Sequence, residues 1–245
     1  MASPTRQKLV HIHLPGIIPY ATAARLQASL VSRFLASKLL TNAPPAPPPP
    51  HIITAQFQPV YTCGRREIGT VSAQQQAFLR ADGRADFVEA MRGGQTTFHG
   101  PGQLVAYPIL DLRTHRITPR RYVCLLEKSL IATCAQFGIQ AMTTEHTGVW
   151  TSPDDKIAAI GVHMRRNITS HGIGLNVHTD LWWFDRIVAC GLEGKSTTSF
   201  EREGVVGSSV EHVRDVFVKK VGERLLGLEG VERVGEDEVE ELMKS

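Results

Sequence analysis

The sequence predicts a single α/β domain, on two kinds of periodicity and on its length. Residues 9–14 alternate apolar and polar side chains, as a half-buried strand does, while residues 20–40 repeat apolar side chains every three to four positions, as a helix does. Such segments recur along 245 residues, a length that suits one large core. We therefore expect one domain at residues 1–230, followed by a short, solvated acidic segment at 231–245.

The predicted elements follow one another through short connections. Strands are expected at residues 9–14, where Pro15 and Gly16 end the run, and at 51–62, 87–91, 104–112, 140–144, 148–150, 156–163 and 172–177. Helices are expected at residues 20–40, 71–79 and 118–138, and a last helix follows the capping box at 208–211. Thr118 suits the N-cap of the third helix and Pro119 its first turn. Residues 42–50 contain six prolines and are expected to form a solvent-facing insertion.

The composition excludes several classes of protein. Hydrophobic residues make up 42% and charged residues 21%, as in ordinary globular proteins, so wholesale disorder is excluded. No window holds eighteen uninterrupted apolar residues, and a spanning helix is not expected. The net charge is only +3, and the basic residues form no stripe interleaved with aromatic residues, so we expect no nucleic-acid partner.

The four cysteines indicate neither a disulfide framework nor a zinc site. Cys63, Cys124, Cys134 and Cys190 show no C-x-x-C spacing, and the ten histidines form no familiar ligand pattern, so no metal is expected. Cys124 and Cys134 fall within a predicted helix, where a thiol is most simply a small core side chain. Cys190 differs, because it ends an apolar segment and precedes a glycine.

The sequence R-G-G-Q-T-T-F-H-G-P-G-Q-L-V-A-Y, at residues 92–107, is the most distinctive stretch of the chain. It is too rich in glycine for a helix and too polar for a plain core segment. Gly93 and Gly94 allow the backbone to approach a ligand closely, and Gly100 and Gly102 flank a second sharp turn. We interpret the stretch as a ligand-shaping loop between two strands. A glycine-containing hairpin whose histidine is satisfied in the core is the alternative.

This loop and four later motifs together resemble the octanoyltransferases of the lipoyl pathway. The motifs that match, in the same order, are G-V-W at 148–150, K-I-A-A-I-G-V at 156–162, H-G-I-G-L-N-V at 171–177, and A-C-G at 189–191 followed by T-T-S at 197–199. The resemblance covers roughly residues 20–200. A weaker likeness links the same loop to lipoate and biotin protein ligases.

The resemblance implies a fold, an activity and a set of site residues. The fold would be a mixed α/β domain like that of the biotin and lipoate protein ligases, with a central sheet, flanking helices and the site at one sheet edge. By resemblance, Cys190 carries the acyl group as a thioester and Lys156 activates it. The segments that would bind substrate contain Arg92, Gly93, Gly94, Gln95, Thr96, Thr97, Phe98, His99, Ala159, Ile160, Gly161, Gly172, Ile173 and Gly174. The chain departs from the family pattern at Ala189, where proline is common, and at Gly174, where alanine is common.

Elementary chemistry agrees with these roles. A free thiol has a pKa near 8.5, and an adjacent ammonium group such as that of Lys156 would favour the thiolate. Burial of most of an eight-carbon chain would contribute about 5 kcal/mol, at about 0.8 kcal/mol per CH₂ group. Without the resemblance, Lys156 is more simply a surface lysine whose stem lies on apolar surface. His99 could orient the thioester or the lysine.

The resemblance also sets expectations for partners and location. The donor would be octanoyl-acyl carrier protein, and the acceptors would be lipoyl domains such as the glycine-cleavage H protein and the E2 subunits of 2-oxoacid dehydrogenases. No cofactor is expected, and we expect a monomer. An acid-free start before Glu67 and the proline-rich insertion favour a mitochondrial location, with the cytoplasm as the alternative. An ATP-dependent lipoate or biotin ligase and a non-catalytic module that binds lipoyl domains remain alternative functions.

Overall fold

The computed structural model describes residues 7–39, 47–187 and 194–244. The strands are β1 (Gln7–Ile18), β2 (His51–Phe57), β3 (Val60–Cys63), β4 (Asp86–Glu89), β5 (Thr97–His99), β6 (Gln103–Ile109), β7 (Val149–Trp150), β8 (Asp155–Arg165), β9 (Ile168–Asn176), β10 (Ser196–Thr197) and β11 (Leu228–Arg233). The helices are α1 (Tyr20–Ser37), α2 (Ala73–Arg80), α3 (Pro119–Gln136), α4 (Val210–Gly222) and α5 (Glu236–Lys244), with short 3₁₀ helices η1 (Arg65–Glu67) and η2 (Leu181–Arg186).

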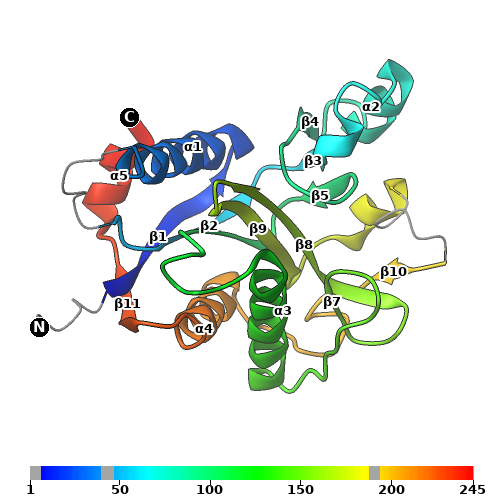
Figure 1. Cartoon of the computed structure of the whole chain (residues 1–245). Helices are drawn as coiled ribbons and strands as arrows, with labels where there is room; N and C mark the ends of the chain where they lie inside the picture. The colour runs from blue at the N-terminus through cyan, green and yellow to red at the C-terminus, as the bar shows by residue number, and fades with distance from the viewer. Residues whose placement is uncertain (1–6, 40–46, 188–193, 245) are drawn as a thin grey trace, which may run out of the picture.

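A large mixed sheet forms the centre of the molecule. Its strand order is β10-β8-β9-β6-β2-β1-β11, and β7 pairs with β8 beside this path. Strand β1 runs parallel to β2 and β11, whereas β2, β6, β9 and β8 pair antiparallel in succession. A smaller sheet, in the order β4-β3-β5, stands next to the large one (Figure 1). The predicted α/β class with a central mixed sheet and flanking helices is therefore confirmed.

Helices cover both faces of the large sheet. In β6, Leu104 and Ala106 pack in a core with α3 and α4, while Val105 and Tyr107 pack in a second core with α1. This alternation follows from the two-residue period of a strand, which points neighbouring side chains to opposite faces. Figure 1 shows α1 and α5 on one side of the sheet and α3 and α4 on the other.

The predicted N-cap of α3 is confirmed, whereas the capping box predicted at 208–211 is wrong, because α4 is capped by Ser209, whose hydroxyl accepts from His212 N–H. The Ser72 hydroxyl accepts a hydrogen bond from the backbone N–H of Gln75 and begins α2. The Thr118 hydroxyl caps α3, with Pro119 in its first turn, and the Ser209 hydroxyl caps α4. Each cap satisfies a backbone donor that the helix itself leaves without a partner.

Besides the division of the strand expected at residues 51–62 into β2, in the large sheet, and β3, in the small one, three details of the fold differ from the predictions. Strand β1 continues past Pro15 and Gly16 to Ile18, because its register with β2 shifts between His13 and Ile17 and absorbs the turn residues. Residues 140–144 make only an isolated bridge between Met142 and Trp150.

The third difference lies at the C-terminus, where the expected solvated segment is part of the fold. Strand β11 crosses the predicted boundary at residue 230 and pairs parallel with β1, and α4 is therefore not the last helix. The α5 side chain of Val239 is only 3% exposed, since it packs in the core under α1.

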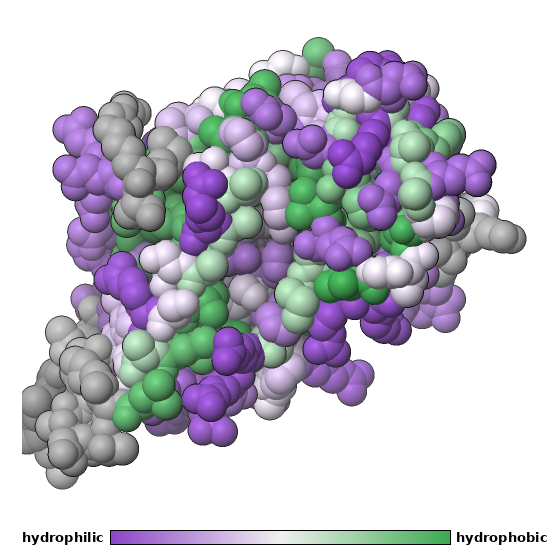
Figure 2. Space-filling view, turned by 90° about the horizontal axis from the view of Figure 1, so that it is seen from above, coloured by the Kyte–Doolittle hydropathy of each residue, from purple (hydrophilic) through white to green (hydrophobic). Residues whose placement is uncertain are grey.

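Surface features agree with a globular body. Among the described residues, no helix has both the length and the apolar character needed to cross a membrane. On the face that Figure 2 shows, hydrophobic residues lie in separate patches between hydrophilic ones.

The proline-rich insertion at 42–50 lies partly outside the described residues, and its last residue, Pro50, accepts a hydrogen bond from Val10 N–H at 2.8 Å.

Candidate active site

A cavity lies over the pairing of β8 with β9, and we call it the acyl cavity after the chain that the sequence analysis expects it to bind. Two cross-strand pairs of small residues face it, Ala159 opposite Gly174 and Gly161 opposite Gly172. It encloses about 480 Å³ of atom-free space, part of which is open to solvent. Its lining comprises Arg92, Gly94, Gln95, Thr97, His99, Tyr107, Thr147, Ala159, Ile160, Gly161, His171, Gly172, Ile173 and Gly174.

Arg92 holds the glycine loop against this cavity. Its side chain is 6% exposed, and Nε donates to the Thr62 hydroxyl at 2.9 Å while Nη2 donates to the Thr62 carbonyl. Nη1 donates to the carbonyls of Gly93 and Gln95, each at 2.9 Å. Because burial disfavours the charged form, the pKa of Arg92 is lowered from its ordinary value. The guanidinium thus fastens the loop to β3 by several hydrogen bonds at once.

Glycine is required where the loop approaches its neighbours. A Cβ atom on Gly64 would lie only 1.8 Å from the carbonyl oxygen of Gly94, and Gly94 itself has a φ of +83°. The N–H of Gly93 donates to Val162 on β8 at 3.0 Å. The backbone of the loop can therefore pack directly on β3 and β8, and this contact explains the glycines of the motif.

Lys156 is buried in a second cavity, which we call the lysine cavity. The residue is 5% exposed, its Nζ donates to the Thr147 carbonyl at 3.3 Å, and Nζ lies 4.5 Å from the centre of the Trp150 ring. The interpretation of Lys156 as a surface lysine is therefore wrong. The lysine cavity holds about 330 Å³ of atom-free space and is lined by Thr97, Gln103, Lys156, Ala159, Gly174, Asn176, Phe184, Ile187 and Thr197.

The two cavities adjoin each other. They share Thr97, Ala159 and Gly174 in their linings, so Lys156 and the Arg92 loop border neighbouring cavities. The lysine is located at the start of β8, and the glycine pair Gly161–Gly172 is located further along the same strand pair. A ligand that lies along β8 would therefore contact both.

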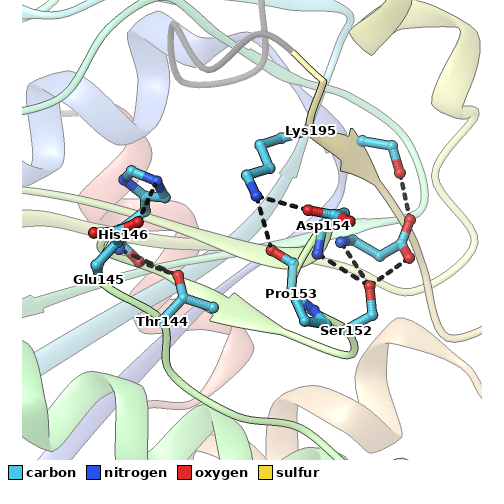
Figure 3. Close-up of polar contacts among 9 residues, drawn as sticks. Thr144, Glu145, His146, Ser152, Pro153, Asp154 and Lys195 are labelled. Atoms are coloured by element: carbon cyan, nitrogen blue, oxygen red, sulfur yellow. Dashed lines mark hydrogen bonds and ion pairs between the residues drawn. The ribbon is translucent and has the colours of Figure 1, made fainter.

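The turn before β8 fixes the position of Lys156. The Ser152 hydroxyl accepts hydrogen bonds from the N–H groups of Asp154 and Asp155 and lies 2.6 Å from the Asp155 carboxylate. Lys195 Nζ lies 2.6 Å from the Asp154 carboxylate, and this pair ties the turn to β10 (Figure 3). Strand β10 then pairs Thr197 with Lys156.

Cys190 lies outside the described residues. Ile187 and Thr197, which precede and follow that segment in the chain, both line the lysine cavity. None of the three described cysteines lines either cavity: Cys63 and Cys134 are buried, and Cys124 is partly buried in α3. Burial raises the pKa of Cys134 to about 12, so this thiol is inert at neutral pH.

Two histidines at the acyl cavity are held in the neutral form. Burial, with help from the Arg92 charge, lowers the pKa of His99 to about 4 and that of His171 to about 3. Burial also raises the pKa of Tyr107 well above its ordinary value. At neutral pH these groups therefore act as hydrogen-bonding groups and not as charges.

The structure brings together most, but not all, of the predicted substrate-binding residues. Gly93 faces a separate hollow beside Arg65 and Arg66, on the far side of the loop. The Thr96 hydroxyl donates to the Glu67 carboxylate at 3.1 Å, away from both cavities. Phe98 is buried and stacks on Trp183 with ring centres 4.9 Å apart. These three residues therefore do not line the acyl cavity, whereas their neighbours Gly94, Gln95, Thr97 and His99 do.

The sequence did not identify Gln103, Asn176 and Thr147 as site residues. Gln103 and Asn176 lay within quoted motifs, but nothing in the sequence indicates that two residues so far apart form a hydrogen bond. Thr147 contributes a backbone carbonyl, which leaves no trace in the residue type. Among the described residues, no group of three or more His, Cys, Asp or Glu side chains could hold a metal ion.

Comparison with known proteins relates this chain to one family. Residues 30–225 match the model of the lipoyl protein ligase A/B catalytic domain. A Schizosaccharomyces pombe protein named probable octanoyltransferase is 49% identical over 211 residues, which is 86% of this chain and 92% of the relative. A mitochondrial octanoyl-acyl-carrier-protein:protein N-octanoyltransferase of Danio rerio is 45% identical, over 82% of this chain and 85% of the relative.

Solved structures share the fold at low sequence identity. A bipartite lipoate protein ligase from Thermoplasma acidophilum superposes with a TM-score of 0.61 at 14% identity, covering 97% of this chain and 91% of that chain. LipL1 of P. falciparum, solved with lipoate, gives a TM-score of 0.68 at 11% identity over 97% of this chain and 68% of that chain. These likenesses concern the arrangement of the elements alone.

Proposed function

The chain belongs to the octanoyltransferase family, within the lipoyl protein ligase A/B catalytic domains, and on this premise we propose its reaction and its catalytic residues. It is an acyltransferase. Its donor is octanoyl-acyl carrier protein, and its acceptor is a specific lysine of a lipoyl domain, so that it performs the first step of protein lipoylation. Cys190 is the nucleophile and Lys156 is its partner.

The observation that carries this proposal is the burial of Lys156 in a cavity that adjoins the acyl cavity. A buried ammonium group favours a thiolate beside it, and the thiolate is the reactive form of cysteine. Cys190 follows Ile187, a residue of the lysine cavity, by three positions. Three residues span at most about 11 Å, so the thiol is within reach of the cavity.

The proposed reaction has two half-reactions. In the first, the Cys190 thiolate attacks the thioester carbonyl of the donor, the carrier thiol leaves with a proton from the Lys156 ammonium group, and a new thioester forms on the enzyme. In the second, the lysine amine of the acceptor attacks that thioester, the C–S bond breaks, and the amine proton returns to the enzyme as the amide forms. Thioester exchange costs little free energy, and the thioester donor is already activated, so no nucleotide takes part.

The acyl cavity suits a short, unbranched chain. Four of its lining residues, Ala159, Gly161, Gly172 and Gly174, have only a methyl group or no side chain to extend into it. Contact over most of eight carbons contributes about 5 kcal/mol at about 0.8 kcal/mol per CH₂ group. Arg92 stands near Gly161, since a Cβ on Gly161 would lie 3.1 Å from Arg92 Cδ. The loop therefore limits the cavity at the Gly161 end, away from Lys156.

The names of the relatives support a location and a class of partner. The Danio rerio relative and an octanoyltransferase of Saccharomyces cerevisiae are both named mitochondrial. We place this chain in mitochondria on that ground. The Thermoplasma ligase was solved in a study that included an E2 lipoyl domain, and lipoyl domains of that kind are the acceptors we assign here.

A transfer assay tests the proposal. Octanoyl-acyl carrier protein and a lipoyl domain are incubated with the enzyme without ATP, and the mass of the lipoyl domain is followed. Cys190→Ala should abolish transfer, whereas Cys124→Ala, a matched change of a partly buried thiol in α3, should leave it intact. Transfer that persists in Cys190→Ala, or that requires ATP and free octanoate, would exclude the mechanism and favour a ligase.

A further inference from the structure

A buried chain of side-chain amides connects His99 to the strand segment beside Lys156. His99 Nδ1 lies 2.6 Å from Gln103 Oε1, and Gln103 Nε2 donates to Asn176 Oδ1 at 2.9 Å. Asn176 Nδ2 donates to the Thr198 carbonyl at 3.0 Å, and Thr198 N–H donates to the Lys156 carbonyl at 2.9 Å. His99, Gln103 and Asn176 are 6%, 2% and 3% exposed, so these groups depend on each other for partners.

Two backbone carbonyls fix the orientation of both amides. The Asn176 atom that faces the Thr198 carbonyl must be nitrogen, because a carbonyl oxygen accepts only, and its oxygen therefore faces Gln103. The Gln103 nitrogen must face that oxygen, and it also lies 3.3 Å from the Phe98 carbonyl, a second obligatory acceptor. Gln103 consequently presents its oxygen to the ring of His99.

This orientation determines the tautomer of His99. An oxygen acceptor 2.6 Å from Nδ1 requires that Nδ1 carry the proton. His99 is neutral at pH 7, because burial lowers its pKa to about 4, so Nε2 carries a lone pair. No hydrogen bond joins Nε2 to any of the described residues, and His99 lines the acyl cavity.

The His99 ring carbon Cε1, which lies between the two ring nitrogens, is close to Gly174. A Cβ atom on Gly174 would lie 3.4 Å from His99 Cε1 and 3.0 Å from Gln103 Oε1. Gly174 itself lines both cavities. The glycine at this position leaves space for the His99–Gln103 pair beside β9.

We propose that Gln103 and Asn176 lock His99 in the Nδ1–H tautomer so that His99 Nε2 accepts a hydrogen bond from the amine of the acceptor lysine. This role rests on the proposed function and concerns its second half-reaction. The amine nitrogen attacks the thioester carbonyl and the C–S bond breaks. This step leaves a thiolate on Cys190 and releases one proton from the amine. His99 aims the nitrogen lone pair at the carbonyl by holding one N–H, while the proton passes to the thiolate through Lys156.

His99 is assigned to orientation and not to proton removal on physical grounds. An imidazolium with a pKa of about 4 is too acidic to keep the proton of an amine at neutral pH. An unprotonated nitrogen can nevertheless accept a hydrogen bond, and correct aim is worth one to several powers of ten in rate. Gln103 and Asn176 are positioning residues, since they act on the substrate only through His99.

A spectroscopic experiment tests the tautomer by itself. In the full-length, uniformly ¹⁵N-labelled protein at pH 7, long-range proton–nitrogen correlation distinguishes a protonated Nδ1 from a protonated Nε2. We expect Nδ1–H for His99, and a mixture of tautomers in Gln103→Met, which keeps the side-chain volume but offers no oxygen. Observation of Nε2–H in the wild type would overturn the proposal, whether or not the enzyme transfers octanoate.

The half-reactions, measured separately, test the role. Octanoylation of the enzyme is followed by intact mass, and the acyl-enzyme is then mixed with lipoyl domain. We expect His99→Phe and Gln103→Met to slow the transfer to the lipoyl domain about a hundredfold and tenfold, respectively, and to slow formation of the acyl-enzyme by a smaller factor in each case. Ser129→Ala, which removes a buried hydroxyl from α3, should slow neither step.

A charged variant separates orientation from simple packing. Gln103→Glu still accepts from His99 Nδ1, but its carboxylate favours the imidazolium and so should raise the pH of half-maximal transfer by about one unit or more. A purely structural role predicts an equal loss at every pH. Equal slowing of both half-reactions in Gln103→Met, or an unshifted pH profile in Gln103→Glu, would contradict the proposal. A wild-type enzyme that forms no acyl-enzyme would instead refute the proposed function.

Discussion

Two hollows of the molecule differ both in size and in chemistry. The acyl cavity, between β8, β9 and the Arg92 loop, holds about 480 Å³ of atom-free space. A second hollow between β1, β11 and α4, which we call the rear hollow, holds about 1200 Å³. Each is bordered by a buried histidine of lowered pKa, His99 in the first and His11 in the second. By size alone, the rear hollow would be the stronger candidate for a binding site.

Their side chains show why size misleads. His11 Nε2 lies 2.8 Å from the Thr54 hydroxyl, and the charged residues of the rear hollow, Asp215, Lys219 and Arg233 among them, are of both signs. Lys219 is exposed, whereas Lys156 is 5% exposed and lies over an aromatic ring. A functional site is therefore marked by a cation and a lone pair that are buried beside open space, because burial is what changes their reactivity.

Removal of the two lysine charges should sharpen this contrast most. Lys156→Met should slow formation of the acyl-enzyme about a hundredfold to a thousandfold, because the thiolate loses the ammonium group that favours it. Lys219→Met in the rear hollow should leave the rate within about twofold. Pre-steady-state acylation measured by intact mass gives both rates, and equal effects of the two changes would remove Lys156 from the mechanism.

Two glycine substitutions compare the rigidity of the two regions. A Cβ on Gly172 would lie 2.1 Å from the Ala106 carbonyl oxygen inside the sheet, so Gly172→Ala should lower the free energy of unfolding by about 4 kcal/mol. The nearest atom to a Cβ on Gly222 is a Val231 methyl at 3.2 Å, and Gly222→Ala should change stability by about 1 kcal/mol or less. Urea denaturation measures both changes in stability. If Gly172→Ala is as stable as the wild type, the sheet is not closely packed around Gly172.

Acid should destabilise the fold through both buried histidines. His99 is neutral when folded, with a pKa of about 4, but takes up a proton near pH 6.5 when unfolded. Its stabilisation is therefore complete above pH 6.5 and is lost as the pH falls towards 4, with a total of about 3 kcal/mol. His99→Phe should flatten part of this dependence in denaturation curves at several pH values. His11→Gln should flatten another part without an effect on transfer, and an unchanged slope in both variants would contradict the assigned pKa values.

A change at the closed end of the acyl cavity should alter chain-length preference modestly. A Cβ on Gly161 would lie 2.9 Å from the Gly93 carbonyl, so Gly161→Ala should shorten the space available beside the loop. We expect the ratio of kcat/KM for octanoyl over hexanoyl donors to fall about tenfold, the range that one or two methylene groups command in an apolar pocket. Gly222→Ala should leave that ratio unchanged. A lower rate with both donors and an unaltered ratio would place the chain end elsewhere.

The sequence predicted those features of the site that depend on which residue types occur at which positions. The Arg92 glycine loop and the small pairs of β8 and β9 each require particular residues at particular spacings, and each was predicted. Gln103 and Asn176 were missed because their hydrogen bond joins residues 73 positions apart, and either amide is unremarkable in its own strand. The pairing of β11 with β1 was missed for a similar reason, since its exposed, charged residues carry no apolar signal.

Passage of the acyl group through Cys190 can be measured on the enzyme itself, by mass. The wild-type enzyme is mixed with octanoyl-acyl carrier protein in the absence of a lipoyl domain, and the intact protein and its peptides are weighed. We expect one added octanoyl group, located on Cys190, that disappears when lipoyl domain is added. Full transfer of the octanoyl group by an enzyme on which no acyl group is ever found at Cys190 would contradict the proposed mechanism.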